Sequence, residues 1–176
     1  MSHPLELFQY CPRCGSAHFA VNDARSKRCA DCGFTYYANS SAATAAVIIN
    51  ARGEMLVSRR AFEPARGTLD LPGGFIDPGE DAVAGVLREV LEETGAKAEM
   101  RRFLFSLPNE YEYSGFTVHT CDLFFEVSIL DETAVFAHDD AAELFWISLD
   151  KIRPEDFGLA SIRRGVERLK KEIRLS

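Results

Sequence analysis

Apolar side chains recur with a helical period near the middle of the chain. They follow the i, i+3, i+4, i+7, i+8 spacing of a helix that buries one face: Val83, Val86, Leu87, Val90 and Leu91. Asp81 follows a turn at residues 77–79 and is expected at the N-cap, and Gly95 is expected to end the helix in the left-handed conformation. The rest of the chain is organised around this predicted helix.

Shorter apolar runs on both sides of that helix predict β-strands. Before it, strands are expected at residues 45–49, 54–60 and 68–71, the first two forming a hairpin, with a linker at residues 35–44. After it, the pattern predicts strands at residues 97–107, 116–130 and 144–147, an aromatic loop at 111–113, a short helix at 148–151 and a surface helix at 161–173. Strands interleaved with two main helices predict an α/β fold with a mixed sheet between helices.

Composition places the chain among globular proteins, with 47% hydrophobic and 27% charged residues in 176. An apolar run of about 18 residues and a basic-then-apolar N-terminus are both missing, which predicts a cytoplasmic protein that does not enter the membrane. The net charge of −7 disfavours nucleic acid as a partner, because binding a phosphate backbone needs a basic surface. An anionic substrate would therefore need a metal ion or a few arginines.

Two CxxC pairs, each followed by a glycine, lie within residues 1–40: Cys11, Cys14, Cys29 and Cys32. This spacing predicts a tetrathiolate site for structural Zn²⁺ and resembles a zinc ribbon. Disulfides are disfavoured because Cys121 would remain unpaired and no export signal is present. So short a unit buries little core, and the metal would supply most of its folding free energy. We expect a zinc ribbon at residues 1–40 and a main domain at 41–176.

Glu89, Glu92 and Glu93 fall on one arc of the predicted helix, beside its apolar stripe. Carboxylates one turn apart repel each other. A hard divalent cation such as Mg²⁺ removes this cost, and it usually keeps waters that leave room for a substrate phosphate. On helix geometry alone, a solvated acidic face is the favoured explanation of the triplet.

The spacing around the triplet resembles the Nudix box. The matching positions are, in order, Gly74, Glu80, Arg88, Glu89, Val90, Glu92, Glu93, Gly95 and Ala96. Ala96 departs from the pattern, since its place usually holds a larger aliphatic residue. The resemblance covers residues 43–173 and implies the Nudix α/β/α sandwich, preceded here by the zinc ribbon.

The resemblance also implies an enzyme and its site. It implies a Mg²⁺- or Mn²⁺-dependent pyrophosphohydrolase acting on a nucleoside diphosphate linked to another moiety, such as ADP-ribose or a dinucleotide. The metal ligands would be three carboxylates and one main-chain carbonyl, from Glu89, Glu92, Glu93 and Gly73. Glu89, Glu92 and Arg88 are the expected catalytic residues, Arg88 orienting the carboxylates together with Glu80.

Other residues of the site are less defined by sequence. Nudix proteins differ in their general base. The candidates outside the box are Glu110, Glu112, Asp139, Asp140 and Glu143, for each of which a solvated or structural role is the favoured interpretation. Arg59, Arg60 and Arg66 could contact substrate phosphates or simply be solvated. Tyr111 could stack on a nucleobase or pack in a core.

A zinc ribbon before a Nudix domain is similar to the NADH pyrophosphatase branch. That branch carries a Ser-Gln-Pro-Trp-Pro-Phe-Pro array after its box, whereas residues 105–111 here read FSLPNEY. The substrate therefore stays open among ADP-ribose, other nucleoside diphosphate derivatives and nucleoside triphosphates. A Nudix-fold nucleotide sensor without turnover is the alternative function, and an intact acidic triplet argues against it. The ribbon is expected to be structural, and a homodimer is left open.

Overall fold

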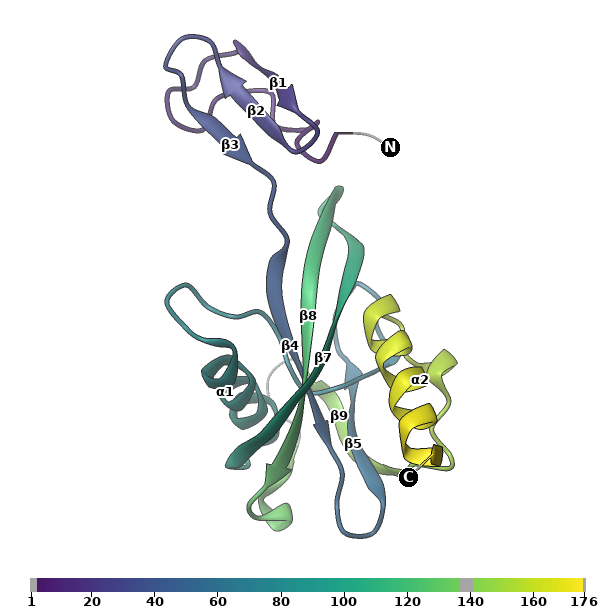
Figure 1. Ribbon diagram of the computed structural model, residues 1–176. Helices are drawn as coiled ribbons and strands as arrows, with labels where there is room; N and C mark the ends of the chain where they lie inside the picture. Colours follow the sequence, from purple (N-terminus) through teal and green to yellow (C-terminus); the bar gives the residue numbers. More distant parts are fainter. Residues whose placement is uncertain (1–2, 137–140, 176) are drawn as a thin grey trace. The chain divides into compact units, whose positions relative to one another are not determined.

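The computed structural model describes residues 3–136 and 141–175 (Figure 1). The chain divides into two compact units. The first consists of Met1–Ser40 and Glu112–Val118, and the second of Ser41–Tyr111 and His119–Ser176. A short internal segment, residues 112–118, thus groups with the N-terminal residues, which the sequence did not suggest.

The first unit contains one antiparallel sheet. Its strands are β1 (Phe19–Asp23), β2 (Ser26–Cys29) and β3 (Thr35–Tyr37), in the order β1-β2-β3. The buried core is small and consists of Cys11, Phe19 and Cys29. Two of these three core residues are predicted metal ligands, so the core and the metal site are largely the same atoms.

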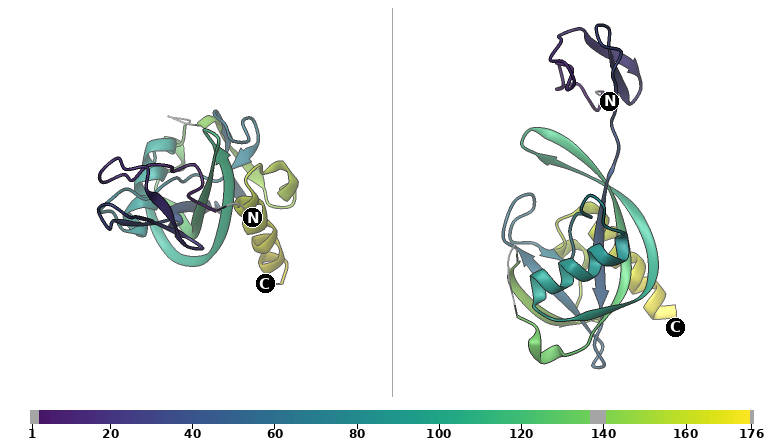
Figure 2. Two further views of the ribbon diagram at one scale, coloured as in Figure 1. Left: turned by 90° about the horizontal axis from the view of Figure 1, so that it is seen from above. Right: turned by 90° about the vertical axis from the view of Figure 1, so that its left-hand side faces the viewer.

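The second unit contains two three-stranded sheets, with a helix on either side of the strands (Figures 1 and 2). One sheet has the order β4-β8-β7, from Ser41–Ile48, Phe116–Ile129 and Ala98–Tyr113. The other has the order β6-β5-β9, from Leu69–Asp70, Glu54–Arg60 and Ala141–Ser148. The helices are α1 (Ala82–Thr94) and α2 (Ala160–Leu175), with short 3-10 turns at Glu132–Ala134 and Pro154–Asp156. The expected α/β architecture is confirmed, with two sheets rather than one.

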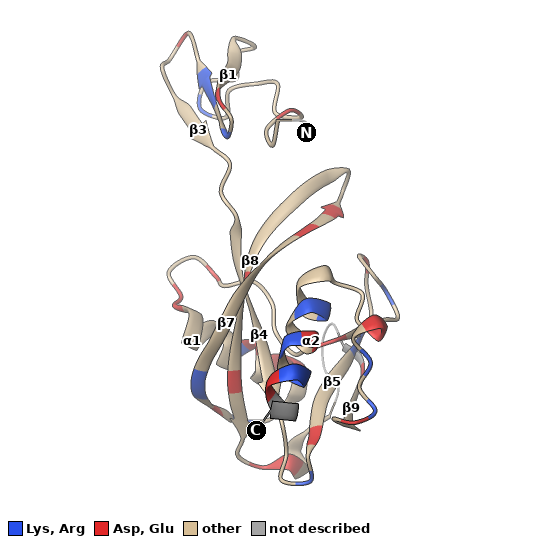
Figure 3. Cartoon of the chain, turned by 45° about the vertical axis from the view of Figure 1, so that its right-hand side comes forward, with Lys and Arg blue, Asp and Glu red and all other residues tan. Residues whose placement is uncertain are grey.

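Strand β4 is buried on both faces, which explains its continuous apolar sequence. Ala45 and Val47 belong to the core cluster that includes residues of α2, while Ala46 and Ile48 belong to the cluster that includes residues of α1. β4 pairs in parallel with β8, and β5 pairs antiparallel with both of its neighbours, so the strands are of mixed direction. Helix α2 carries several basic residues with acidic ones between them (Figure 3).

Several local predictions are confirmed. Helix α1 begins after the N-cap Asp81 and ends at Gly95, whose φ of 70° is left-handed. Strand β5 coincides with residues 54–60, and α2 covers the predicted C-terminal helix. Among the described residues, no helix is both long and apolar enough to cross a membrane.

Four local predictions are wrong. The expected β4–β5 hairpin is reduced to one bridge, Ile49 to Met55, because β4 takes β8 as its partner. The supposed linker at residues 35–44 contains β3 and the start of β4. Residues 111–113 end β7 instead of forming a loop, since the chain reverses at Ser114 and Gly115, both with positive φ. The short helix expected at 148–151 is a turn.

Candidate active site

The acidic helix is anchored at both ends and along one face. Asp81 Oδ1 accepts hydrogen bonds from the backbone N–H groups of Val83 and Ala84, each at 2.9 Å, which satisfies donors that a helix start leaves unpaired. At the other end, Gly95 N–H donates to the carbonyl of Leu91 at 2.8 Å. Val86 and Val90 are buried in the core, so the carboxylates of α1 project from a fixed scaffold.

The loop before α1 is tied to strand β4. Thr44 N–H donates to the carbonyl of Gly74 at 2.8 Å, and Ala46 N–H donates to that of Pro72 at 2.7 Å. Gly73 has a φ of 149°, and a Cβ there would lie 2.1 Å from the carbonyl oxygen of Thr44. Any other residue at 73 would push the loop off the strand, so the close approach requires glycine.

The same loop meets two of the predicted metal ligands. A Cβ on Gly74 would lie 2.5 Å from Glu89 Oε1, which shows how closely this carboxylate approaches the loop backbone. Gly73 N–H donates to Glu93 Oε2 at 3.3 Å. The carboxylate oxygens of Glu89 and Glu93 on α1 therefore lie beside the backbone of the loop at Gly73 and Gly74.

Arg88 connects the carboxylates of the box. Its Nε and Nη2 each donate to one oxygen of Glu80 at 3.0 Å, and its Nη1 donates to Glu89 Oε1 and Glu92 Oε2 at 2.9 Å each. Nη2 also donates to the carbonyl of Phe75 at 2.9 Å. The expected contact of Arg88 with Glu92 is present, and Glu80 and Glu89 join it. One guanidinium thus fixes three carboxylates and the loop.

The carboxylates differ in their electrostatic surroundings. Hydrogen bonds from Arg88 lower the pKa of Glu80. Burial raises the pKa of Glu89, although Arg88 opposes the rise, and the charge of Glu92 adds to it. The negative charge of Glu89 is therefore incompletely compensated by the protein, and a proton or a metal cation would stabilise it.

The residues present fit a divalent cation by their chemistry. Glu89, Glu92, Glu93 and the carbonyl of Gly73 are all hard oxygen donors, as Mg²⁺ and Mn²⁺ prefer. Their oxygens do not surround one point, because Arg88 holds Glu89 and Glu92. Loading would require these side chains to turn, and the ligand set stays a prediction.

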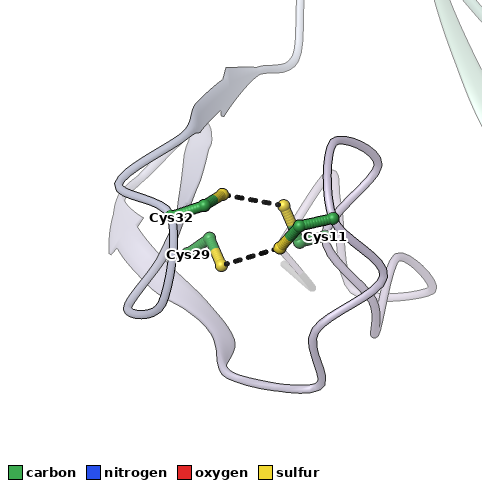
Figure 4. Close-up of side chains that lie close together, drawn as sticks. Cys11, Cys29 and Cys32 are labelled. Atoms are coloured by element: carbon green, nitrogen blue, oxygen red, sulfur yellow. Dashed lines mark hydrogen bonds between the residues drawn. The ribbon is translucent and has the colours of Figure 1, made fainter.

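The four cysteines, in contrast, already converge. Their Sγ atoms lie within 4.8 Å of one another, the one such compact group of ligand atoms found among the described residues. Cys11 lies 3.7 Å from Cys32 and Cys14 lies 3.7 Å from Cys29, both measured between Sγ atoms (Figure 4). Such a group could bind zinc tetrahedrally.

The thiols also affect each other's protonation. The backbone N–H of Cys32 lowers the pKa of Cys29 to about 6. The pKa of Cys14 rises to about 12, since hydrogen bonds with the other thiols and burial outweigh the lowering effect of Ser16 N–H. Without a cation the cluster keeps protons that a tetrathiolate site must release, so metal binding should displace them.

Two of the three predicted phosphate-binding arginines, Arg59 and Arg60, already bind other groups of the protein. Arg60 Nη1 lies 2.5 Å from Asp70 Oδ2, and its Nε donates to the carbonyl of Pro64 at 2.7 Å. Arg59 Nε donates to Glu143 Oε2 at 2.9 Å. Arg66 is exposed on the loop that follows β5, and Tyr111 is half-buried near the end of β7. The roles of these four residues toward a substrate stay predictions. Arg60 has the least exposed ion pair among them, with Asp70.

The candidate bases lie in different settings. Glu110 Oε1 is 3.3 Å from His119 Nδ1, Glu112 accepts from Thr117 at 2.5 Å, and Glu143 pairs with Arg59. Asp139 and Asp140 lie outside the described residues. All the candidates described here have structural partners, and the identity of the base stays open.

One polar cluster was missed from the sequence. Asp70 and Asp122 interrupt apolar strand sequences and are both buried, and each is hydrogen-bonded by other polar side chains. A charged residue in an otherwise apolar strand was the available signal, because buried charges are rare unless they are paired.

Comparison with known proteins defines the class. The model of the NUDIX domain matches residues 39–168, and the chain belongs to this family. Within the family, the chain is 27% identical over 158 residues to the NAD-capped RNA hydrolase NudC of Haemophilus influenzae, covering 88% of this chain and 57% of that protein. It is 32% identical over 98 residues to NudC of Chromobacterium violaceum, covering 56% of this chain and 36% of that protein. The chain thus spans about half the length, or less, of these relatives.

Solved structures agree on the fold. A NUDIX hydrolase from Nitrosomonas europaea superimposes with a TM-score of 0.75 at 24% identity, covering 93% of this chain and 91% of that one. The MutT protein from Methanosarcina mazei Go1 gives a TM-score of 0.60 at 28% identity, covering 76% of this chain and 94% of that one. The first comparison covers nearly the whole chain and confirms the expected architecture.

Proposed function

We propose that this protein is a divalent-cation-dependent pyrophosphohydrolase acting on a nucleoside diphosphate linked to another moiety. The observation that carries the proposal is the box of α1, in which Arg88 gathers three carboxylates beside the loop at Gly73 and Gly74. The NUDIX family match and the names of the NudC relatives support a nucleotide-derived substrate.

Charge and positioning account for the reaction. Cleaving a pyrophosphate bond needs compensation of oxygen charge and an oriented water, with little covalent help from the protein. Glu89, Glu92, Glu93 and the Gly73 carbonyl would hold Mg²⁺ or Mn²⁺, which supplies charge neutralisation and a more acidic bound water. Arg88 orients Glu89 and Glu92, and one carboxylate of the site would take the proton from the attacking water.

The finer assignments follow from chemistry and position. Arg59, Arg66 and Tyr111 would contact the phosphates and base of the substrate, and Zn²⁺ at the four cysteines would stabilise the ribbon. ADP-ribose and dinucleotides fit the proposed class. The two-domain division, a homodimer and a cytoplasmic location stay predictions from the sequence.

The substitution Glu93→Gln tests the proposal. It removes a charged ligand while preserving size, so phosphate-bond hydrolysis with Mg²⁺ should fall about 1,000-fold, a loss of about 4 kcal/mol in transition-state stabilisation. The melting temperature should hardly change. The matched control is Glu99→Gln, an exposed glutamate on β7 paired with Arg101, which should keep full activity.

The assay is product release from ADP-ribose, NAD, NADH and nucleoside triphosphates. Equal activity of wild type and Glu93→Gln would refute the role of Glu93. Tight nucleotide binding by the wild type without hydrolysis would identify a sensor instead.

A further inference from the structure

The least exposed ion pair in the described part of the chain joins β5 to β6, just before the loop at Gly73 and Gly74. Arg60 Nη1 lies 2.5 Å from Asp70 Oδ2, and the two side chains are 22% and 11% exposed. Burial raises the pKa of Asp70, although Arg60 opposes the rise. Taking two charges out of water costs free energy that their attraction repays only in part, and less polar side chains of similar size often serve a fold as well. Stability alone therefore does not account for this pair.

Arg60 connects β5 with two segments that follow it. Its backbone N–H donates to the carbonyl of Thr68 at 3.0 Å. Its side-chain Nε donates to the carbonyl of Pro64 at 2.7 Å, while Nη1 binds Asp70. Because the guanidinium is planar and rigid, these two bonds fix Asp70 relative to the loop that contains Pro64.

Asp70 in turn holds the chain that leads to Gly73. Its second oxygen, Oδ1, accepts a hydrogen bond from the backbone N–H of Leu71 at 2.9 Å. The Leu71 side chain is buried in the core. The ring of Pro72 restricts its own φ, and its carbonyl accepts from Ala46 N–H at 2.7 Å. Each residue from 70 to 72 is therefore fixed by at least one contact or restriction.

Gly73 depends on these neighbours for its orientation. It has no side chain that could anchor it, and its positive φ lies in a region open to glycine. On its far side, the carbonyl of Gly74 accepts from Thr44 N–H at 2.8 Å. The direction of the Gly73 carbonyl is thus determined by residues 70–72 before it and by Gly74 after it.

We propose that Arg60 and Asp70 are positioning residues of the metal site, holding residues 70–72 so that the Gly73 carbonyl is oriented as a ligand of the divalent cation. This inference rests on the proposed function for the cation and its ligand set. Groups that hold metal ligands in place typically contribute about 10- to 100-fold to metal affinity or activity. Arg60 therefore serves the loop of the box and not a substrate phosphate.

The test is the double variant Arg60→Met with Asp70→Asn. It removes both charges and keeps an oxygen acceptor for Leu71 N–H. Mn²⁺ binding is measured by electron paramagnetic resonance on protein first saturated with zinc, and Glu93→Gln identifies the part of the binding that belongs to the box. The Kd for Mn²⁺ at the box should rise about 10-fold, while the melting temperature of the protein without Mn²⁺ changes little.

Two further variants sharpen the result. Arg60→Lys keeps the charge but replaces the rigid planar group by a single ammonium, so its Kd for Mn²⁺ should lie between those of wild type and the double variant. The matched control is Arg102→Met with Glu126→Gln, which removes an exposed pair between β7 and β8 and should leave the Kd for Mn²⁺ unchanged.

Kinetics separate positioning from direct substrate binding. In the double variant, saturating Mn²⁺ should restore much of kcat for a hydrolysed nucleotide, and KM at that Mn²⁺ concentration should match wild type. An unchanged Kd for Mn²⁺ overturns the inference, whether the melting temperature falls or KM rises. A raised KM with unchanged Mn²⁺ affinity would show that Arg60 binds a substrate phosphate.

The inference and the proposed function can fail separately. If the double variant binds Mn²⁺ as tightly as wild type and wild type hydrolyses nucleotides, the inference fails and the proposed function stands. If the affinities differ as expected and wild type hydrolyses no nucleotide, the proposed function fails and the positioning role stands.

Discussion

In the first unit, four Sγ atoms from two short loops lie within 4.8 Å of one another, and two of those cysteines are also its core. In the second unit, the carboxylates of α1 project from a helix buried against a large core, and Arg88 binds two of them, Glu89 and Glu92, together with Glu80 of the preceding loop. Both are predicted metal sites. The cysteine site has almost no core apart from its own ligands, whereas the carboxylates are held by a buried helix and by Arg88. Metal should therefore be needed for folding of the first unit and for catalysis in the second.

The physical basis of this difference is where the compensating charge comes from. A thiolate cluster with a core of three residues has little apolar burial to offset its own repulsion. The carboxylates of the box have an internal cation and a scaffold whose stability does not depend on them. The comparison yields three predictions, from the largest expected effect to the smallest.

The largest effect should come from Cys14→Ser. Binding of structural zinc supplies about 10 kcal/mol to domains of this kind, so the first unit should unfold or lose its zinc, and the second should not. Zinc content and hydrogen exchange of residues 3–40 measure this. Cys121→Ser, at the exposed fifth cysteine, is the control and should retain one zinc per chain. If the first unit stays folded in metal-free protein, the two units do not differ in their need for metal to fold.

A smaller effect is expected for Arg88→Met. The change leaves Glu80 and Glu89, both mostly buried, without their cation, and should lower the free energy of unfolding by about 3 kcal/mol. Mg²⁺ should recover part of that loss by binding the folded state. Denaturant unfolding of wild type and Arg88→Met, with and without Mg²⁺, measures both free energies of unfolding. Arg101→Met, in an exposed pair with Glu99, should cost under about 1 kcal/mol. Equal losses would show that Arg88 is no internal counter-ion.

The smallest effect concerns pH. Because burial raises the pKa of Glu89, the folded state holds this proton more tightly than the unfolded state. Ionised Glu89 therefore costs stability, and the cost grows as pH rises from the ordinary glutamate pKa through the folded one. The melting temperature of Glu89→Gln minus that of wild type should accordingly increase from about pH 4 to 7 without divalent metal. Added Mg²⁺ should reduce the difference.

Glu80→Gln provides the opposite control. Arg88 lowers the pKa of Glu80, so ionisation of Glu80 stabilises the wild type as pH rises. The melting temperature of Glu80→Gln minus that of wild type should therefore decrease over the same pH range. Parallel slopes in the two variants would contradict the electrostatic description of the box.

Features determined by neighbouring residues could be predicted. The ends of α1 follow from Asp81, Gly95 and the apolar period between them, which are all local signals. The convergence of the cysteines follows from short CxxC loops closed by glycines, whose N–H groups bond back to Cys11 and Cys29. Local chemistry decides these structures whatever the rest of the chain does.

Features that need distant partners could not be predicted. The sequence places Arg88 one turn from Glu92, but its bonds to Glu80 and the Phe75 carbonyl depend on how the loop folds back. The partner of β4 was misjudged because adjacent strands usually pair, whereas here the partner is β8. The bond between Asp122 of β8 and Ser161 of α2 joins two distant segments, and no local pattern relates them.

The parallel pairing of β4 with β8 has a consequence for how the protein is made. Ser41 aligns with Thr120 and Ile48 with Val127, so these contacts close long loops, which slows folding. The loop at Pro72 and Gly74 docks on β4, yet β4 gains its other neighbour only once residue 127 has been synthesised. A nascent chain that has just completed the box would therefore emerge from the ribosome with one edge of β4 and its face toward α2 still uncovered, a stage at which chaperones would be of most use.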